Sequence, residues 1–258
     1  MGIEVFNRFE KKYLIRNEQY EELVNRLNEY MELDPYNQAN GFYTICNIYY
    51  DTKNHDLIKR SLAKPEYKEK LRLRAYGVPK SGTKGYLEIK KKYKGIVNKR
   101  RTNITLQEAY DFVDMQKKPK RQAYHNQQVL AEIDYFMKRY ELKPMVYIAY
   151  DRKAMCKGNL RITFDTNIRT RRYDLALELG DYGTSLLEDG MWLMEIKIDQ
   201  AFPLWLSGIL SEMEIYSKSY SKYGAEFINF IGHPQRKGAI EPCLNQYSQV
   251  KPQVIQYL

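Results

Sequence analysis

Several segments of the chain alternate apolar and charged residues, which is the pattern of β-strands with one buried face. Leu87 and Ile89, for example, alternate with Glu88 and Lys90. Successive side chains of a strand point to opposite faces of a sheet, so the charged residues share one face and the apolar residues share the other. The pattern predicts strands at about 3–15, 42–51, 67–76, 84–93, 96–104, 145–153, 159–165, 168–174 and 191–198.

Apolar residues at helical spacing lie between these strands. They predict helices at about 18–31, 106–117, 127–140 and 204–215, and a short helix near 54–62. Asn17 is expected to cap the first helix, and Thr105 with Glu108 has the signature of a capping box. Roughly eight strands joined mostly by short turns indicate an α+β fold, an antiparallel barrel flanked by helices. One domain is predicted over residues 1–232, followed by a tail over residues 233–258.

The charged faces of the predicted strands are unusual, because Lys, Glu and Asp are poor strand formers. A single charged pair is commonly explained as the solvated face of an antiparallel sheet. These pairs recur on most of the strands, however. If the apolar faces pack outward against the helices, the charged faces line a polar tunnel that needs a polyanion or water to compensate its charge. The residues are Arg8, Glu10 and Lys12, Arg72 and Arg74, Glu88 and Lys90, Lys99 and Arg101, Arg161 and Asp165, and Glu195 and Lys197.

The composition favours an anionic partner. The 258 residues include 42 Lys and Arg against 32 Asp and Glu, a net charge of +10, which fits nucleic acid, phosphorylated metabolites, polyphosphate or an acidic membrane. The interleaved glutamates disfavour nucleic acid, whose groove would be nearly all basic. The scattered Cys and His residues leave only a hard cation held by oxygen ligands as an expected metal. The sequence has neither a signal-peptide pattern nor a membrane-spanning apolar run, so the cytoplasm is the expected location.

Eight short motifs in order resemble the VTC domain, the polyphosphate polymerase domain of the vacuolar transporter chaperone complex and its bacterial relatives. This family belongs to the CYTH or triphosphate tunnel metalloenzyme superfamily, so the resemblance implies an eight-stranded antiparallel tunnel. It covers about residues 3–230. The motifs are RFEKKYL at 8–14, NIYYDT at 47–52, LRLRAYG at 71–77, LEIKKKYKGIVNKRR at 87–101, YDRKAM at 150–155, LRITFDT at 160–166, LMEIKI at 193–198 and SKSYSKYG at 217–224.

The resemblance also implies roles for individual residues. Glu195 resembles the carboxylate that holds a catalytic Mn²⁺ or Mg²⁺, and Glu10, Glu88 and Asp165 are expected to assist it. Lys222 resembles a late lysine near one tunnel mouth. The expected catalytic residues are Arg72, Arg74, Lys90, Arg152, Arg161 and Glu195. The expected phosphate-binding residues are Arg8, Lys12, Lys99, Arg101, Lys197 and Lys222.

The activity implied by the resemblance is transfer of the γ-phosphate of ATP to a growing inorganic polyphosphate chain. CYTH triphosphatases open with ExExK, and here Arg8 replaces the first glutamate, which favours a polymerase over a two-metal hydrolase. Two alternatives stay open: a hydrolase of triphosphate or polyphosphate in the same tunnel, and a non-catalytic module that binds polyphosphate or nucleic acid. Eukaryotic relatives carry this domain on membrane segments, so a membrane partner is compatible with the resemblance. The sequence does not specify the oligomeric state.

Overall fold

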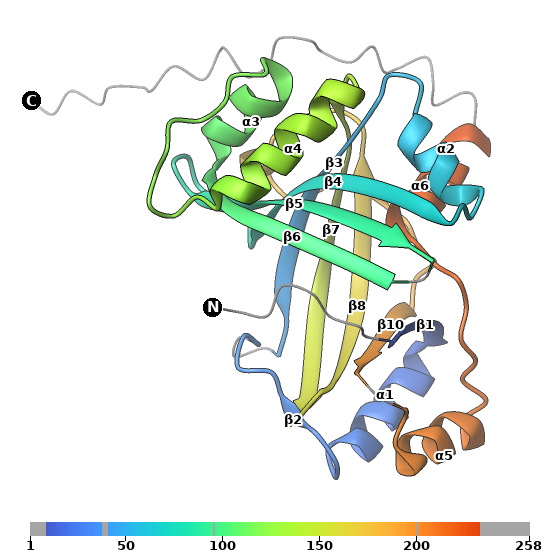
Figure 1. Ribbon diagram of the computed structural model, residues 1–258. Coiled ribbons are helices and arrows are strands. Elements are labelled where there is room, and N and C mark those ends of the chain that lie inside the picture. The colour runs from blue at the N-terminus through green and yellow to red at the C-terminus, as the bar shows by residue number, and fades with distance from the viewer. Residues whose placement is uncertain (1–8, 38–40, 95, 200, 233–258) are drawn as a thin grey trace, which may run out of the picture.

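One curled antiparallel sheet organises the protein in a computed structural model that describes residues 9–37, 41–94, 96–199 and 201–232 (Figure 1). Its strands are β1 (Phe9–Arg16), β2 (Glu32–Leu33), β3 (Tyr43–Asp51), β4 (Tyr67–Tyr76), β5 (Lys84–Tyr93), β6 (Ile96–Thr105), β7 (Lys143–Lys157), β8 (Leu160–Arg171), β9 (Thr184–Ser185) and β10 (Met191–Ile198). Its helices are α1 (Asn17–Leu27), α2 (Asp56–Leu62), α3 (Leu106–Asp114), α4 (Gln127–Arg139), α5 (Leu204–Glu212) and α6 (Lys222–Gly232), and Leu177–Leu179 forms one 3-10 turn. The predicted tail, residues 233–258, lies outside the described residues.

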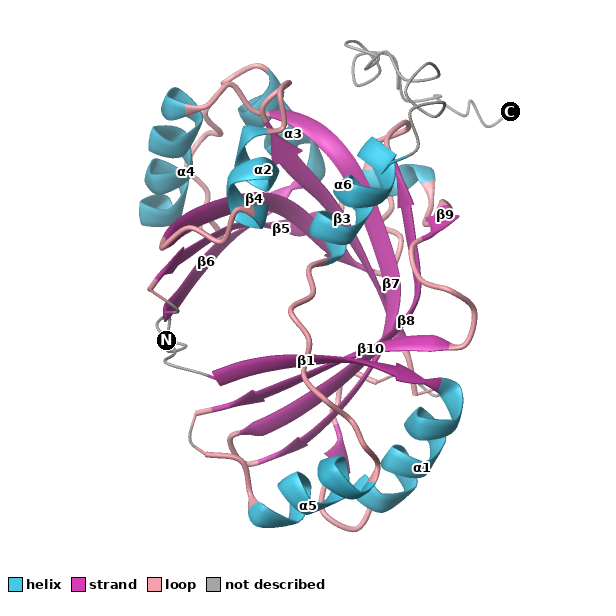
Figure 2. Ribbon diagram, turned by 90° about the vertical axis from the view of Figure 1, so that its right-hand side faces the viewer, coloured by secondary structure: helices cyan, strands magenta, loops and turns pink. Residues whose placement is uncertain are grey.

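Eight strands follow one another in the order β1-β10-β8-β7-β3-β4-β5-β6, and the short strands β2 and β9 add to β7 and β8. All the described pairings are antiparallel, so the predicted antiparallel sheet with flanking helices is confirmed. The predicted backbone closure is not seen, because β1 and β6 end the order and do not pair within the described residues. Figure 2 shows these two edge strands on either side of the opening of a strongly curled sheet.

The segments predicted as two strands, 159–165 and 168–174, form the single strand β8. Asn167 lies inside it with a φ of +48°, in the left-handed region that Asn tolerates better than most residues. The register between β7 and β8 shifts opposite this point, between Ala149 and Asp151. A bulge of this kind bends a strand without ending it, which explains why the alternation breaks there although the strand continues.

The convex face of the sheet is covered by four helices (Figure 2). Helices α3 and α4 pack against apolar residues of β3 to β7, around Phe112 and Phe136. Helices α1 and α5 pack against β1, β8 and β10, around Leu23 and Phe164. The apolar faces of the strands therefore point outward to the helices, as the alternation predicts, and their charged faces point to the concave side.

Two helix starts test the capping predictions. Thr105 and Glu108 form the predicted capping box of α3: the Glu108 N–H donates to Thr105 Oγ1 at 3.3 Å and the Thr105 N–H donates to Glu108 Oε2 at 3.0 Å. Asn17 does not cap α1, because it is already the first helical residue and Arg16 occupies the cap position. The Asn17 side chain instead accepts a hydrogen bond from Trp192 Nε1 at 3.1 Å. The side chain that the sequence pattern assigned to the cap thus binds a tryptophan of β10 instead.

Part of the concave face is apolar, which the expectation of a wholly polar lining missed. Ile45, Val146 and Ile148 are buried there together with Tyr223 and Phe227 of α6. Helix α6 was not predicted as a helix. None of the helices in the described part of the chain is long and apolar enough to cross a bilayer.

Candidate active site on the inner face of the sheet

The predicted charged residues that the structure describes lie together on the concave face, and the strand register explains how. Lys12 of β1 pairs with Glu195 of β10, and Lys197 of β10 pairs with Arg161 of β8. Toward the other end of the strand order, and on the same face, Arg72 of β4 pairs with Glu88 of β5, and Glu88 pairs with Arg101 of β6. Arg8 lies outside the described residues. Strands distant in the sequence thus bring the charged pairs into one lining.

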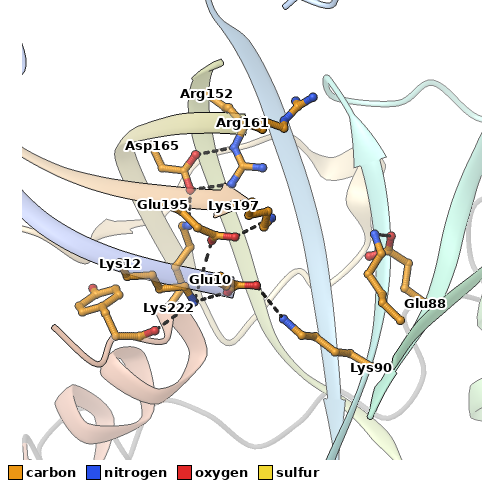
Figure 3. A network of polar contacts seen from close by, with 12 residues as sticks. Glu10, Lys12, Glu88, Lys90, Arg152, Arg161, Asp165, Glu195, Lys197 and Lys222 are labelled. Carbon is orange, nitrogen blue, oxygen red and sulfur yellow. Dashed lines mark hydrogen bonds and ion pairs between the residues drawn. The ribbon is translucent and has the colours of Figure 1, made fainter. Parts of the chain in front are cut away.

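The first group joins Glu10, Lys12, Glu195 and Lys197 on β1 and β10 (Figure 3). Lys12 Nζ lies 3.3 Å from Glu10 and 4.0 Å from Glu195, and Lys197 Nζ lies 2.5 Å from Glu195. Burial would raise the pKa of Glu195, but the charges of Lys197 and Lys12 outweigh it and hold the pKa well below its usual range. Glu195 is therefore ionised at neutral pH.

The second group surrounds Asp165, which is fully buried (Figure 3). Arg152 donates two parallel hydrogen bonds to its carboxylate at 2.5 and 2.8 Å, the geometry that makes Arg–carboxylate pairs strong. Lys222, the first residue of α6, donates a third at 2.5 Å. Asp165 thus orients two of the predicted phosphate-binding cations and ties α6 to the sheet.

The third group surrounds Glu88, whose side chain is 1% exposed. Its oxygens accept hydrogen bonds from Arg72 at 2.6 Å and Lys99 at 3.0 Å, and Arg74 lies 4.0 Å away. Burial would raise the pKa of Glu88, but Arg72 and Arg74 lower it strongly. Because Arg72, Lys99 and Arg74 all engage it, Glu88 acts here as the anchor of three cations.

Lys90 connects the two edges of the curled sheet. Its ammonium lies 3.7 Å from Glu10, which joins β5 to β1 across the opening that the backbone leaves (Figure 3). An ion pair between partly exposed side chains contributes little free energy on its own. It nevertheless places the cations of β5 opposite those of β1 and β10, so the lining surrounds the space from both sides.

Arg161 and Arg101 lie toward one end of this lining. Arg161 forms an ion pair with the buried Asp34 and donates a hydrogen bond to the Tyr43 hydroxyl at 3.3 Å. The Arg101 guanidinium lies over the ring of Tyr86, 4.5 Å from its centre. Every predicted site residue that the structure describes thus belongs to the lining.

Several inner residues were not among those predicted from the sequence. Lys70 shares the face of Arg72 and Arg74, so the same two-residue spacing could have identified it; its Nζ lies 3.2 Å from the Ser221 hydroxyl. Tyr49 accepts a hydrogen bond from Arg72 at 3.1 Å, and Tyr150 accepts one from Arg74 at 2.9 Å. The two tyrosines are neutral, so the pattern of charged residues could not identify them. Only the pairing of the strands shows that their hydroxyls bind the arginines.

Burial and charge together give this lining its chemistry. Inner cations outnumber the four acids Glu10, Glu88, Asp165 and Glu195, so positive charge remains after every described ion pair is made. Burial lowers the pKa of Lys70 to about 8 and that of Lys99 to about 8, the latter despite the nearby Glu88. Such a lining favours a ligand that carries several negative charges along its length.

The carboxylates fit a divalent cation only in part. Among the described residues, no three His, Cys, Asp or Glu side chains form a group able to hold a metal by themselves. Glu10 and Glu195, however, both approach the one ammonium of Lys12, and each is an oxygen ligand of the kind Mg²⁺ and Mn²⁺ prefer. One or two carboxylates supplemented by substrate phosphates is a common way to bind Mg²⁺.

Comparison with known proteins agrees with this architecture. The VTC domain family matches residues 7–229. A putative adenylate cyclase from Bacillus halodurans is similar in structure with a TM-score of 0.52 at 15% identity, covering 85% of this chain and 96% of that protein. A putative adenylyl cyclase from Hippeastrum, which has a dominant triphosphatase activity, gives a TM-score of 0.46 at 17% identity, covering 90% and 97%. No curated protein matches. The family match spans most of the sequence, and the chain belongs to the VTC domain family.

Proposed function

We propose that this protein is an ATP-dependent polyphosphate polymerase. The observation that carries the proposal is the surplus of cations on the inner face, four of which Glu88 and Asp165 hold in place. A chain of phosphates has the charge density and the linear shape that such a lining compensates. Membership of the VTC domain family supports the same substrate class.

In the proposed reaction, a terminal oxygen of the polyphosphate chain attacks the γ-phosphorus of ATP. A new P–O bond forms there while the bond from the γ-phosphorus to the β–γ bridging oxygen breaks, and ADP leaves with that electron pair. The acceptor is already ionised, so catalysis requires alignment of the two chains and neutralisation of charge on the transferred group. Arg72, Arg74, Arg152 and Arg161 are suited to this task because guanidinium groups bind phosphate oxygens in a bidentate way.

The lysines have a different role in this proposal. Lys12, Lys90, Lys99, Lys197 and Lys222 supply compact point charges, which need no fixed bidentate geometry to bind successive phosphates of the chain. Glu195, with help from Glu10, would hold a Mn²⁺ or Mg²⁺ ion, which supplies further charge neutralisation at the phosphate oxygens. The anchored acids keep the arginines in fixed positions before substrate arrives, which reduces the ordering needed at the moment of reaction.

The proposal is tested by incubating the purified protein with ATP and Mn²⁺ and separating the products on a gel. We expect long polyphosphate, and we expect Arg74→Gln to lower its production by about 100-fold or more, as does loss of one preorganised charge donor elsewhere. Lys118→Ala is the matched control, because Lys118 is exposed outside the lining. Equal activity of the Arg74 variant would contradict the assigned role.

A hydrolase in the same tunnel makes the opposite prediction. It would release orthophosphate from tripolyphosphate and from ATP, with no long chains at any time. A binding module would retain polyphosphate without metal-dependent turnover of ATP. Phosphate release and polyphosphate binding, measured beside the gel, therefore separate all three functions.

A further inference from the structure

Three tyrosines gather at one end of the inner face. Tyr43 begins β3, Tyr76 ends β4, and Tyr86 lies near the start of β5. The register pairs Ile45 with Tyr76 and Arg74 with Tyr86, which brings the three rings to the same end of adjacent strands. Helix α6 lies at the opposite end of β3, where Tyr223 donates a hydrogen bond to Asp51.

The rings form a connected group. The centres of Tyr43 and Tyr76 lie 6.2 Å apart with tilted planes, and those of Tyr76 and Tyr86 lie 5.9 Å apart edge to face. Tyr76 is the exposed member of the three, with 51% of its surface accessible, whereas Tyr43 is buried. An exposed ring held by two others offers a rigid flat surface on which another ring could stack.

Phosphate-binding cations adjoin this group directly. The guanidinium of Arg101 lies 4.5 Å from the centre of the Tyr86 ring, and Arg161 donates to the Tyr43 hydroxyl at 3.3 Å. Arg74 and Arg72 follow Tyr76 on the same face of β4, two and four residues back along the strand. Four residues span about 13 Å of a strand, so an aromatic surface and a row of guanidinium groups lie in line.

We propose that Tyr43, Tyr76 and Tyr86 form a nucleobase subsite, on which the base of the nucleoside triphosphate donor stacks while its phosphates extend toward Arg74 and Arg72. This inference rests on the proposed function, since it requires a nucleotide donor. Aromatic side chains beside a positively charged groove are a common arrangement for binding bases together with phosphates. The arrangement also fixes the direction of the donor, whose γ-phosphate points away from the tyrosine end.

The test compares binding of ATP and of inorganic tripolyphosphate by calorimetry, with EDTA present to prevent turnover. Loss of a stacked base contact costs about 1–3 kcal/mol, so Tyr76→Leu should weaken ATP binding by about 5- to 150-fold. Its affinity for tripolyphosphate, which has no base, should stay within about a factor of two. Tyr76→Phe keeps the ring and should retain the affinity for ATP.

Tyr93→Leu is the control, because Tyr93 is 53% exposed at the other end of β5, on the face opposite to Lys90 and Lys92. It should change neither affinity. The subsite is overturned if Tyr76→Leu weakens ATP and tripolyphosphate equally, or leaves ATP binding unchanged. If the unaltered protein binds neither ligand, the proposed function itself fails.

Discussion

Tyr49 shows how strongly the inner face acts on a single side chain. Its hydroxyl accepts a hydrogen bond from Arg72. Burial would raise its pKa, but the charges of Arg72 and Arg74 outweigh burial and lower the pKa to about 7. The folded-state pKa therefore lies below the value of an unfolded tyrosine, about 10. Ionisation of Tyr49 then stabilises the fold increasingly as pH rises above about 7, and this stabilisation is lost as pH falls through about 7.

We expect one tyrosine of the ligand-free protein to ionise with a midpoint of about 7. The phenolate absorption of the folded protein would show this as an early step in the titration. Tyr49→Phe should remove the early step, whereas Tyr135→Phe, which changes a ring that is 65% exposed, should keep it. Identical titration curves for the two variants would contradict the assignment.

The proposed role of Glu195 as a metal ligand can also be tested by a single substitution. Glu195→Gln keeps the shape of the side chain but removes the charge that would hold the metal. A divalent ion supplies several kcal/mol to phosphoryl transfer, so we expect metal-dependent turnover to fall by roughly 1000-fold.

Activity measured across a Mn²⁺ titration, together with a thermal melt of the variant, separates loss of metal from loss of fold. Glu29→Gln changes an exposed carboxylate on the loop after α1 and should behave like the unaltered protein. Full activity of the Glu195 variant with Mn²⁺ would exclude Glu195 as the metal ligand.

Sequence patterns identify the inward-facing residues of a strand well, and their partners from other segments poorly. Two-residue spacing placed Arg72, Arg74 and Glu88 correctly on the inner face, because side-chain direction in a strand follows from position alone. Asp34, in contrast, reaches Arg161 from the segment after β2. No local period connects residues that are brought together only by the curl of the sheet.

At the scale of elements, a buried ion pair is one of the contacts that hold helix α6 in place. Arg172 donates two hydrogen bonds to Glu226 at 2.7 and 2.8 Å, and both side chains are almost fully buried. Tyr223 of the same helix donates to Asp51 at 2.9 Å, and Asp51 also accepts the N–H groups of Leu57 and Ile58 at the start of α2. The two helices are thus tied to the sheet through one aspartate and one arginine.

Glu226→Ala should lower the free energy of unfolding by about 3–5 kcal/mol, because it leaves the Arg172 charge buried without its partner. Urea unfolding measures this change. Ile228→Ala, on the exposed side of the same helix, should change it by no more than about 0.5 kcal/mol. A similar effect of both substitutions would show that the ion pair does not anchor α6.

The strands and the outer helices could be predicted from sequence, but α6 could not. Strands such as β4 and β5 alternate over much of their length, and α3 and α4 present one apolar side, so their local patterns agree with their surroundings. Helix α6 buries Glu226 beside Phe227 and begins with Lys222, one of the predicted site residues. Its polar residues are satisfied only by distant partners, which a local pattern does not contain.

The whole molecule concentrates positive charge in a curled sheet. Like charges on the inner face repel one another in the absence of a ligand, and a polyanion relieves that repulsion. The sequence indicated the excess charge and the alternation. Within the described residues β1 and β6 do not pair with each other, and Lys90 meets Glu10 across the opening; this could not be derived from local patterns because it depends on the total curl.

Polyphosphate should therefore raise the melting temperature of the protein. A ligand at 100 times its dissociation constant stabilises the folded state by about 2.7 kcal/mol. Differential scanning fluorimetry with increasing polyphosphate measures the shift, and sulfate at equal ionic strength is the control. A shift no larger than that caused by sulfate would mean that the inner face does not bind the chain.

The fate of the γ-phosphate of radiolabelled ATP tests the central claim most directly. With Mn²⁺ present, a polymerase places the label in long polyphosphate chains and releases one ADP for each phosphate transferred. We predict that result, and we predict that it disappears in Arg74→Gln. Label that appears only as orthophosphate, with ADP released and no chains formed, would contradict the account and identify the protein as a hydrolase.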